Sequence, residues 1–281
     1  MNTNNPLKQY FRQPSIYTRL PSQGKYYPPN SINVPENLEF PVYPMTAVDE
    51  ITYRTPDALY NGQAIVSVIQ SCIPNIKDAW AMPAMDLDSI LVAIRIASYG
   101  HEMQFSSTCP KCGNEDDRVL DLRVVLDSLK SVDYTRPITH GDMQIYFKPM
   151  SYKNLSDNNK SQYETQRTLQ QISSDESEDA QKNRNTQYNQ ILQRITEITI
   201  LALAQSIAVI VTPTAQVTEQ EYILELLKNC DRKLFDEIRD YVVNAKSAAE
   251  IQPLHLSCSK CNNEYDQTVT LNMSDFFVAA S

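Results

Sequence analysis

Four cysteines arranged in two short pairs are the residues of this chain with the clearest chemical potential. The pairs are Cys109-Pro-Lys-Cys112 and Cys258-Ser-Lys-Cys261, in a sequence that has six cysteines in all. A C-x-x-C pair places two sulfur atoms on one tight turn, and two such turns supply the four thiolates that Zn²⁺ binds tetrahedrally. The spacing therefore predicts one zinc site that joins distant parts of the chain.

A single pair is equally compatible with a redox dithiol, a disulfide or chance, so the surroundings of the two pairs matter. Each pair is followed by a polar turn and an alternating apolar run, residues 118–125 after the first pair and 265–271 after the second. Gly113 and Asn262 follow the second cysteine of each pair, where a positive φ turns backbone amides toward sulfur, and Gly and Asn tolerate positive φ best. The duplication predicts two zinc knuckles that each lead into a strand.

A site made of four thiolates has no open position for water or substrate, so the expected zinc is structural and metal catalysis is not expected. The histidines do not change this interpretation. His101 and His140 lie outside ligand spacing. His255 precedes Cys258 by three residues, and we expect it to face outward from the strand that enters the knuckle.

The two remaining thiols, Cys72 and Cys230, lie in or beside apolar helical patterns. We expect them to be small buried hydrophobic groups without chemistry. The N-terminus has no apolar targeting segment, and the longest apolar run, residues 198–211, is interrupted by Thr, Gln and Ser. These patterns predict no membrane span and favour a protein that works in a reducing, soluble compartment.

The composition is that of an acidic globular protein. The 281 residues are 42% hydrophobic, enough for one large core or two modest ones, and the formal net charge is −9. Nonspecific nucleic-acid binding draws most of its affinity from the phosphate backbone, which an acidic protein repels. The knuckles themselves carry only Lys111 and Lys260 as basic residues, next to several acids, namely Glu115, Asp116, Asp117, Glu264 and Asp266. We therefore expect no nucleic-acid partner.

The first 45 residues are rich in Pro, Asn, Ser and Tyr and lack helical periodicity. Prolines fix φ and bias the preceding residue toward extended backbone, so residues 1–45 are predicted to form an extended arm. The arm carries apolar side chains at Leu20, Tyr26, Tyr27, Phe40 and Tyr43. These side chains fit two alternatives, an arm that wraps its own domain and an arm that reaches a partner.

A helical domain is predicted over residues 46–104. Thr46 is a suitable N-cap for one helix, and Thr55-Pro56 is suitable for the start of a second. Residues 63–72 and 86–99 have apolar side chains at helical spacing and end near Pro74 and Gly100. This domain would deliver the chain to the first knuckle.

A second helical domain is predicted over residues 151–251, after a short β segment at residues 144–149. A polar helix is expected at residues 153–172, followed by an acidic solvated connection at residues 173–183. The alternative role of that connection is a docking site for a basic partner. Three more helices complete the domain: residues 188 to about 211, a helix opened by a capping box at Thr218 and running through Leu227, and residues 232–243.

These patterns together predict a mainly α protein with a small β part. The β part is a split zinc-ribbon-like unit made of residues 105–150 and 252–281, with the helical domain of residues 151–251 inserted into it. No phosphate-binding loop, dinucleotide fingerprint, nucleophile elbow or zinc-protease motif occurs. Neighbouring carboxylates have ordinary capping and helix-dipole explanations, at Asp49 with Glu50, Asp86 with Asp88 and Asp116 with Asp117. We therefore expect no enzyme.

Several short motifs, in order along the chain, carry a resemblance to a known family. They are Leu20-Pro-Ser-Gln-Gly-Lys-Tyr-Tyr27, Tyr43-Pro-Met-Thr-Ala-Val-Asp-Glu50, Thr55-Pro-Asp-Ala-Leu-Tyr-Asn-Gly62, Ile94-Arg-Ile-Ala-Ser-Tyr-Gly100, Cys109-Pro-Lys-Cys-Gly113 and Phe276-Phe277. The chain resembles the baseplate hub subunits and hub assembly proteins of T-even-type contractile-tailed bacteriophages. The resemblance covers residues 20–125 best and the second knuckle next, while residues 153–246 match only in helical character.

The resemblance implies a late viral protein that joins or helps to assemble the central hub of the tail baseplate. Its expected partners are baseplate hub and tail proteins, and its expected place is the host cytoplasm during assembly or the virion tail. No catalysis is implied. The competing hypothesis is a viral regulatory factor whose zinc ribbon binds nucleic acid, which requires folding to gather basic side chains on one face, namely Lys111, Arg118, Arg123, Lys130 and Lys260.

Overall fold

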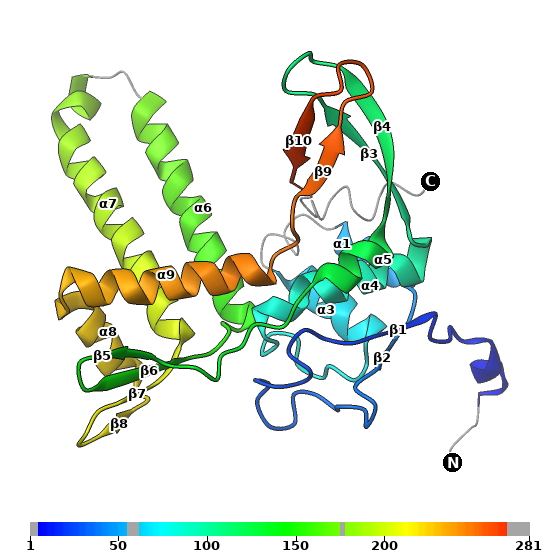
Figure 1. Ribbon diagram of the computed structural model, residues 1–281, viewed down its shortest axis with the longest axis horizontal. Helices are drawn as coiled ribbons and strands as arrows, with labels where there is room; N and C mark the ends of the chain where they lie inside the picture. The colour runs from blue at the N-terminus through cyan, green and yellow to red at the C-terminus, as the bar shows by residue number, and fades with distance from the viewer. Residues whose placement is uncertain (1–4, 55–61, 175–177, 269–281) are drawn as a thin grey trace. The chain divides into compact units, whose positions relative to one another are not determined.

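The computed structural model describes residues 5–54, 62–174 and 178–268, with side chains apart from residues 173–185. The chain divides into two compact units. Unit 1 comprises Met1–Ala79, Met85–Ser131 and Ala249–Ser281, and unit 2 comprises Trp80–Ala84 and Val132–Ala248. Helices account for 47% and strands for 19% of the structure, so the protein is mixed α/β with more helix than strand. Figure 1 shows the elements of each unit.

The N-terminal segment lies largely on unit 1 itself. After the short 3-10 helix η1 (Pro6–Tyr10), strand β1 (Ile16–Thr18) pairs antiparallel with β2 (Phe40–Val42). Leu20, Phe40 and Val42 are buried in the core. Of the two alternatives for the arm, the structure supports self-wrapping for the part that contains these strands.

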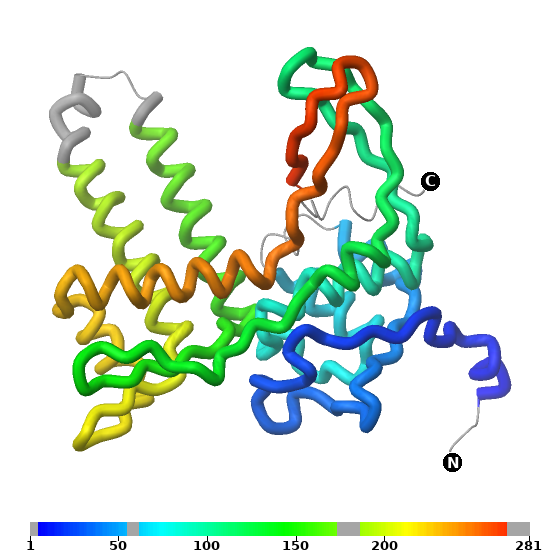
Figure 2. Tube along the Cα trace, viewed as in Figure 1, coloured from blue at the N-terminus to red at the C-terminus, as the bar shows by residue number. Residues whose placement is uncertain are grey.

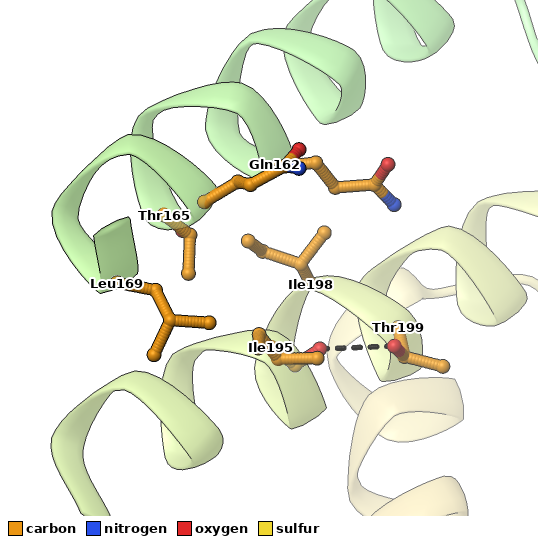
Figure 3. A pocket seen from close by; sticks show the side chains of 7 residues that line it. Gln162, Thr165, Leu169, Ile195, Ile198 and Thr199 are labelled. Carbon is orange, nitrogen blue, oxygen red and sulfur yellow. Dashed lines mark hydrogen bonds between the residues drawn. The ribbon is translucent and has the colours of Figure 1, made fainter. Parts of the chain in front are cut away.

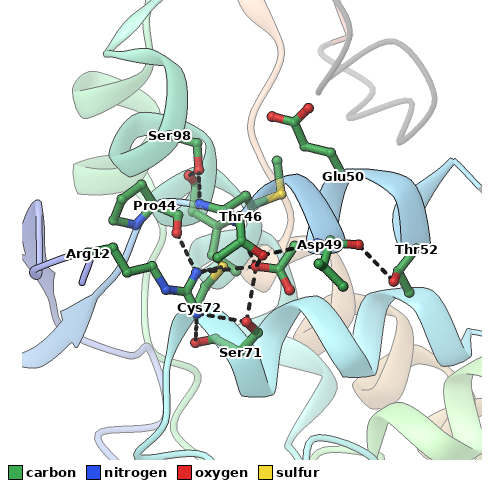
Figure 4. Close-up of polar contacts among 12 residues, drawn as sticks. Arg12, Pro44, Thr46, Asp49, Glu50, Thr52, Ser71, Cys72 and Ser98 are labelled. Carbon is green, nitrogen blue, oxygen red and sulfur yellow. Dashed lines mark hydrogen bonds and ion pairs between the residues drawn. The ribbon is translucent and has the colours of Figure 1, made fainter. Parts of the chain in front are cut away.

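Arg12 ties this segment to the first helices of unit 1, as Figure 4 shows. Its guanidinium donates to a carboxylate oxygen of Asp49 at 3.2 Å and to the Ser71 carbonyl at 2.7 Å. Asp49 also closes a capping box with Thr46 at the start of α1 (Ala47–Tyr53), which confirms the predicted cap. One buried carboxylate thus caps a helix and pairs with the arm.

The helical core of unit 1 is built around α4 (Leu87–Tyr99), which packs against α3 (Gln63–Cys72). Most of α4 is buried, so this helix is the centre of the unit. Both helices match the predicted ranges to within one residue. The helix expected from Thr55 lies outside the described residues.

The side chain of Asp86 was expected to cap a helix, and this expectation was wrong. It lies in the 3-10 helix η2 (Ala84–Asp86), is fully buried, and makes no side-chain cap at α4. Instead it accepts hydrogen bonds from the Ser22 amide at 2.8 Å, the Ser22 hydroxyl at 2.6 Å and the Tyr27 hydroxyl at 3.0 Å. Burial raises the pKa of Asp86 to about 6 against these hydrogen bonds. Asp86 therefore anchors the N-terminal turn.

Unit 2 is built on an antiparallel sheet in the order β5 (Ile138–His140), β6 (Met143–Phe147), β7 (Ile207–Val211), β8 (Gln216–Val217). Helices α8 (Gln220–Asn229) and α9 (Arg232–Ala249) complete it. They share one core with β6 and β7, formed by buried side chains that include Ile145, Phe147, Ile207, Ile210, Ile223, Leu227, Leu234 and Ile238.

Two predictions in this unit were wrong. The helix expected to run to about residue 211 ends at Ser206, because the β-branched run that follows pairs with β6 as β7. The capping box expected at Thr218 does not form, since α8 has Glu219 as its N-cap and no side-chain cap. At the end of α7, the long-range pairing with β6 overrides the local helical pattern. At α8, the helix starts one residue later than the predicted capping box requires.

Helices α6 (Tyr152–Ser174) and α7 (Glu178–Ser206) pack side by side as a long hairpin. Because α7 begins at Glu178, much of the predicted solvated connection at residues 173–183 is helical instead. The same hairpin joins the sheet through β7, which follows α7 directly. Within the described part of the chain, no helix is sufficiently long and apolar to cross a bilayer.

Candidate metal centre

Two β-hairpins of unit 1 carry the two cysteine pairs at their tips. Strands β3 (Glu102–Thr108) and β4 (Glu115–Asp121) form the first hairpin, and β9 (Leu254–Ser257) and β10 (Glu264–Gln267) form the second. The strand predicted over residues 118–125 ends earlier, at Asp121. The Asp121 side chain caps helix α5 (Leu122–Ser128), which follows it. In Figure 2 the tips of the two hairpins lie next to each other.

The two knuckles, residues 109–114 and 258–263, have the same backbone geometry. The Cys109 amide donates to the Asn114 carbonyl at 2.9 Å, and the Cys258 amide donates to the Asn263 carbonyl at 3.0 Å. Gly113 and Asn262 have φ values of 68° and 52°, which confirms the positive φ expected at this position. Because this conformation favours Gly and Asn, the two knuckles are set by local sequence.

The four sulfur atoms of Cys109, Cys112, Cys258 and Cys261 form one cluster, within 4.8 Å of one another. The Cys109 and Cys261 sulfurs are 3.7 Å apart, as are those of Cys112 and Cys258. A disulfide has an S–S distance of about 2.05 Å, so the cysteines are not bonded in pairs. Zinc–sulfur bonds of about 2.3 Å in a tetrahedron place sulfurs about 3.8 Å apart. The donor set therefore fits Zn²⁺.

The four cysteines differ in their exposure to solvent. Cys109 and Cys258 are buried, Cys112 is exposed and Cys261 is intermediate. Burial raises the pKa of the Cys109 thiol, but hydrogen bonds from the Cys112 and Lys111 amides and from neighbouring thiols outweigh it and bring the pKa to about 7. A backbone hydrogen bond from Asn263 lowers the pKa of the Cys261 thiol, but burial and hydrogen bonds with the other three thiols outweigh it and raise the pKa to about 12. Without a metal ion the cluster therefore keeps protons, and metal binding would release them, because the thiolate is the form that binds metal.

Polar contacts that the sequence did not suggest also join the hairpins around the cluster. The Ser259 hydroxyl donates to a carboxylate oxygen of Asp116 at 2.6 Å. The Ser107 hydroxyl is 2.7 Å from the Tyr265 hydroxyl, and Arg118 donates to the Ser257 carbonyl. The two residues of each contact lie on different hairpins, so a local sequence pattern cannot show that they meet. The sequence shows only that these residues lie near the cysteines.

The other candidate ligands lie elsewhere, as expected. His255 is exposed on β9 and lies 2.9 Å from Asp266, which confirms that it faces outward. His140 belongs to unit 2 and lies 3.0 Å from Glu237. Cys72 is buried in unit 1, where burial raises its pKa to about 12, and Cys230 is half-buried in unit 2. Cys72 is buried as predicted, whereas Cys230 is only partly buried and lies at the edge of the core of unit 2.

Comparison with known proteins identifies the family. A family model described as T4 bacteriophage base plate protein matches residues 15–278. The chain belongs to the T4 baseplate protein family. The match includes both knuckles and also residues 153–246, where the resemblance rested on helical character alone. No curated protein and no solved structure gave a match.

Membership gives this baseplate protein a general role. It is a structural protein of the phage tail baseplate, located in the virion tail, and it interacts with other phage tail proteins. Four cysteines of this baseplate protein lie close together and could hold a metal ion.

Proposed function

We propose that this baseplate protein serves in, or in the assembly of, the central hub of the baseplate, and that a structural zinc ion clamps its two hairpins together. The metal part of the proposal rests on the cluster of four sulfurs. In it Cys112 meets Cys258, 146 residues later in the sequence, and Cys109 meets Cys261, 152 residues later. The hub part rests on the resemblance of the N-terminal motifs to hub proteins.

The small size of the hairpins supports the need for a metal. Each is a separate two-stranded sheet, and β9 and β10 have only four residues each. Isolated two-stranded hairpins are marginally stable at best in water. The contacts that join the hairpins around the sulfurs are polar, so they contribute little hydrophobic stabilisation. Metal binding would supply the missing free energy of folding.

The roles of the residues follow from this geometry. Zinc, when bound, would hold the thiolates of Cys109, Cys112, Cys258 and Cys261 in a closed tetrahedral set and supply no reactive position. The knuckle amides orient and stabilise the thiolates. Asp116 and Ser259 fix the position of one hairpin relative to the other.

An interaction with partners is supported by the start of the chain. Leu7, Tyr10 and Phe11 lie in or beside η1, and all three are exposed. Arg12 anchors the segment immediately after them through Asp49 and Ser71. Aromatic side chains on an anchored segment suit contacts with another protein, because they bring large apolar area at low cost in conformational entropy.

The nucleic-acid alternative receives less support from the surface of the hairpins. The outward faces carry exposed acidic side chains at Glu102, Glu115, Asp117, Glu264 and Asp266. Two of the basic residues that this alternative requires are neutralised by ion pairs, Arg118 by Asp116 at 3.4 Å and Arg123 by Asp121 at 2.6 Å. An acidic face repels a phosphate backbone.

Affinity capture tests the proposed function. The tagged protein is co-expressed with the neighbouring tail genes, bound proteins are identified by mass spectrometry, and zinc is measured in the same eluate. Hub proteins with about one zinc per chain support both parts of the proposal. Capture of peripheral baseplate proteins without hub proteins would overturn the hub assignment, and nucleic acid retained only at low salt would favour the alternative.

A further inference from the structure

The hollow between α6 and α7, of about 250 Å³, has neither a charged group nor a sulfur in its lining. Figure 3 shows Gln162, Thr165 and Leu169 of one helix facing Ile195 and Ile198 of the other. Such a lining offers no metal ligand and no redox-active group. The four-sulfur cluster of unit 1 is different, because a thiol can be oxidised as well as bind metal.

The four thiols of the cluster differ in how easily an oxidant reaches them. Cys112 is exposed and Cys261 is partly exposed, whereas Cys109 and Cys258 are buried. The susceptibility of a cysteine to oxidation follows its exposure as well as its chemistry. An oxidant that arrives from solvent therefore meets the Cys112 sulfur first.

The Cys112 sulfur has a second thiol next to it, on the other hairpin. The Cys258 sulfur lies 3.7 Å away. A disulfide brings two sulfurs to about 2.05 Å, so the two side chains need only a small approach. The contact between Ser259 and Asp116, at 2.6 Å, holds the two hairpin tips together beside these sulfurs. A cysteine oxidised at position 112 can thus be attacked at once by Cys258.

A bond within the first knuckle is disfavoured by the backbone. The amides of Lys111 and Cys112 donate hydrogen bonds to the Cys109 sulfur. The Gly113 amide donates to the Cys109 carbonyl at 2.9 Å. Moving the Cys109 sulfur onto Cys112 would turn it away from these amides and distort a turn that already has a positive φ at Gly113. The geometry favours a bond between the hairpins over a bond within a knuckle.

We propose that Cys112 is an oxidation site and that a peroxide joins it to Cys258, so that a disulfide ties the two hairpins together in the absence of metal. The disulfide links the same two knuckles as the proposed zinc. The proposal rests on the positions of the sulfurs, and it depends neither on bound zinc nor on the hub assignment. It makes the cluster a clamp with two closed forms, one held by metal and one covalent.

The chemistry has two steps and consumes one molecule of hydrogen peroxide. In the first step the Cys112 sulfur attacks a peroxide oxygen, the O–O bond breaks, and the other oxygen leaves as hydroxide, which takes the Cys112 proton and becomes water. In the second step the Cys258 sulfur attacks the sulfur of the resulting sulfenic acid. The S–S bond forms, the S–O bond breaks, and the leaving hydroxide takes the Cys258 proton as water. Two electrons pass from the two sulfurs to the peroxide.

The charges near the cluster favour a small neutral oxidant. Glu115, Asp117 and Glu264 are exposed on the strands beside the two knuckles, and the chain has a net charge of −9. This field repels anionic oxidants such as oxidised glutathione, but it does not repel hydrogen peroxide, which carries no charge. The preferred oxidant class is therefore a peroxide.

The oxidised form suits a protein of the virion tail. Disulfides persist in oxidising surroundings and are rare in the reducing interior of most cells. A tail released from its host has left that interior. The bond between Cys112 and Cys258 would hold the hairpins there, and it would close a loop that spans 146 positions of the chain, which restricts the unfolded state.

Peptide mapping of the full chain after peroxide treatment tests the proposal. Trypsin cuts after Lys111 and Lys260, between the cysteines of each pair, so the four thiols fall on different peptides. We expect peptide 112–118 joined to peptide 247–260, on a chain that non-reducing electrophoresis shows to be a monomer. Dithiothreitol should separate the two peptides. Peptide 112–118 joined to peptide 96–111 should be several-fold less abundant.

Two further measurements locate the first thiol and the cause of the pairing. Dimedone, which traps sulfenic acids, should label Cys112 before the other three cysteines of the cluster. Ser259→Ala should lower the ratio of the bond between hairpins to the bond within a knuckle, because the contact with Asp116 is lost. Ser106→Ala is the matched control, since the Ser106 hydroxyl donates within the first hairpin, and it should leave the ratio unchanged. If Ser259→Ala fails to fold, the ratio in the wild-type chain decides.

Several results would overturn the proposal. They are a predominant bond within a knuckle, a disulfide between two copies of the chain, first labelling of another cluster cysteine, and a cluster that excess peroxide leaves reduced. Oxidised glutathione that acts as efficiently as peroxide would overturn the oxidant class. Zinc is measured in the untreated chain, so a chain without metal contradicts the proposed zinc clamp while the disulfide is tested independently.

Discussion

Asp116 and Ser259 meet across the two hairpins, where the Ser259 hydroxyl and amide both donate to the Asp116 carboxylate, at 2.6 and 3.2 Å. Ser259 is next to Cys258, one of the four cysteines. The hydroxyl and amide of Ser259 are the main reason that the pKa of Asp116 is lowered. This contact fixes the second knuckle at a defined position relative to the first without involving a sulfur atom.

Ser259→Ala is therefore expected to weaken zinc binding by roughly tenfold, because contacts that orient metal ligands typically affect affinity to that extent. Competition with a chromophoric chelator measures the affinity. Ser106→Ala is the matched control, since the Ser106 hydroxyl donates to Asp117 within the first hairpin at 2.7 Å and joins nothing across the cluster. Equal zinc affinities for the two variants would contradict the role of the contact.

Replacing Cys258 by Ser should remove zinc and lower the stability of both hairpins together, because one ion holds both knuckles. Unit 2 should be spared. Trp80, the one tryptophan of the chain, lies in unit 2, where its ring stacks on Tyr152 at 5.5 Å. We expect its fluorescence transition to stay within about 1 kcal/mol of wild type. Cys230→Ser, outside the cluster, should keep its zinc; if Cys258→Ser does so too, the shared site is refuted.

Arg12→Ala should release the N-terminal segment from unit 1. In the variant the Asp49 carboxylate keeps its hydrogen bonds from Thr46 and Ser71 but loses its cationic partner. We expect a loss of about 1–3 kcal/mol in the free energy of unfolding. Limited proteolysis should cut the segment faster. Arg19→Ala serves as the comparison, because Arg19 pairs with Glu39 at 3.1 Å on the surface and should cost less than about 1 kcal/mol. Similar losses in both variants would mean that Arg12 is an ordinary surface charge.

Asp86 should make unit 1 more stable as the pH falls. Burial raises its pKa from 3.8 to about 6, so the folded state binds the proton more tightly than the unfolded chain. This contribution is absent above pH 6 and grows as the pH falls toward 4. Between pH 7 and pH 5 the gain should be about 1 kcal/mol. Urea unfolding at the two pH values measures it.

Asp86→Asn is the control for this pH dependence, because asparagine does not titrate and keeps an oxygen that can accept from Ser22. The difference between wild type and variant removes the contributions of all other groups that titrate in this range. If the two proteins have parallel pH profiles, Asp86 is ionised throughout, and the expected role of its burial is wrong.

Local features of the fold were predictable from the sequence. The two knuckles follow from the cysteine spacing and from Gly113 and Asn262, whose positive φ values the chain must adopt at these positions. The capping box of Thr46 with Asp49 spans only four residues, so the cap at Thr46 could also be predicted from the local sequence. Each of these features depends on neighbouring residues, so a pattern in a short window suffices.

Features that depend on distant partners were not predictable. The end of α7 is decided by the pairing of Ile207–Val211 with β6, some sixty residues earlier in the chain. The role of Asp86 depends on Ser22 and Tyr27, 64 and 59 residues away. The Asp116 contact with Ser259 likewise crosses 143 residues. No window of the sequence contains both partners of such a contact.

The separation of the two knuckles along the chain also sets the order of events during synthesis. A growing chain exposes Cys109 and Cys112 first, and the ribosome must then translate Val132–Ala248 of unit 2 before Cys258 and Cys261 appear. A chain interrupted anywhere between the knuckles carries half of the cluster and cannot close it. Closure of the four-sulfur cluster thus marks a chain that has been translated through the second knuckle. Shorter chains differ from it by two unpartnered thiols at the tip of a single hairpin.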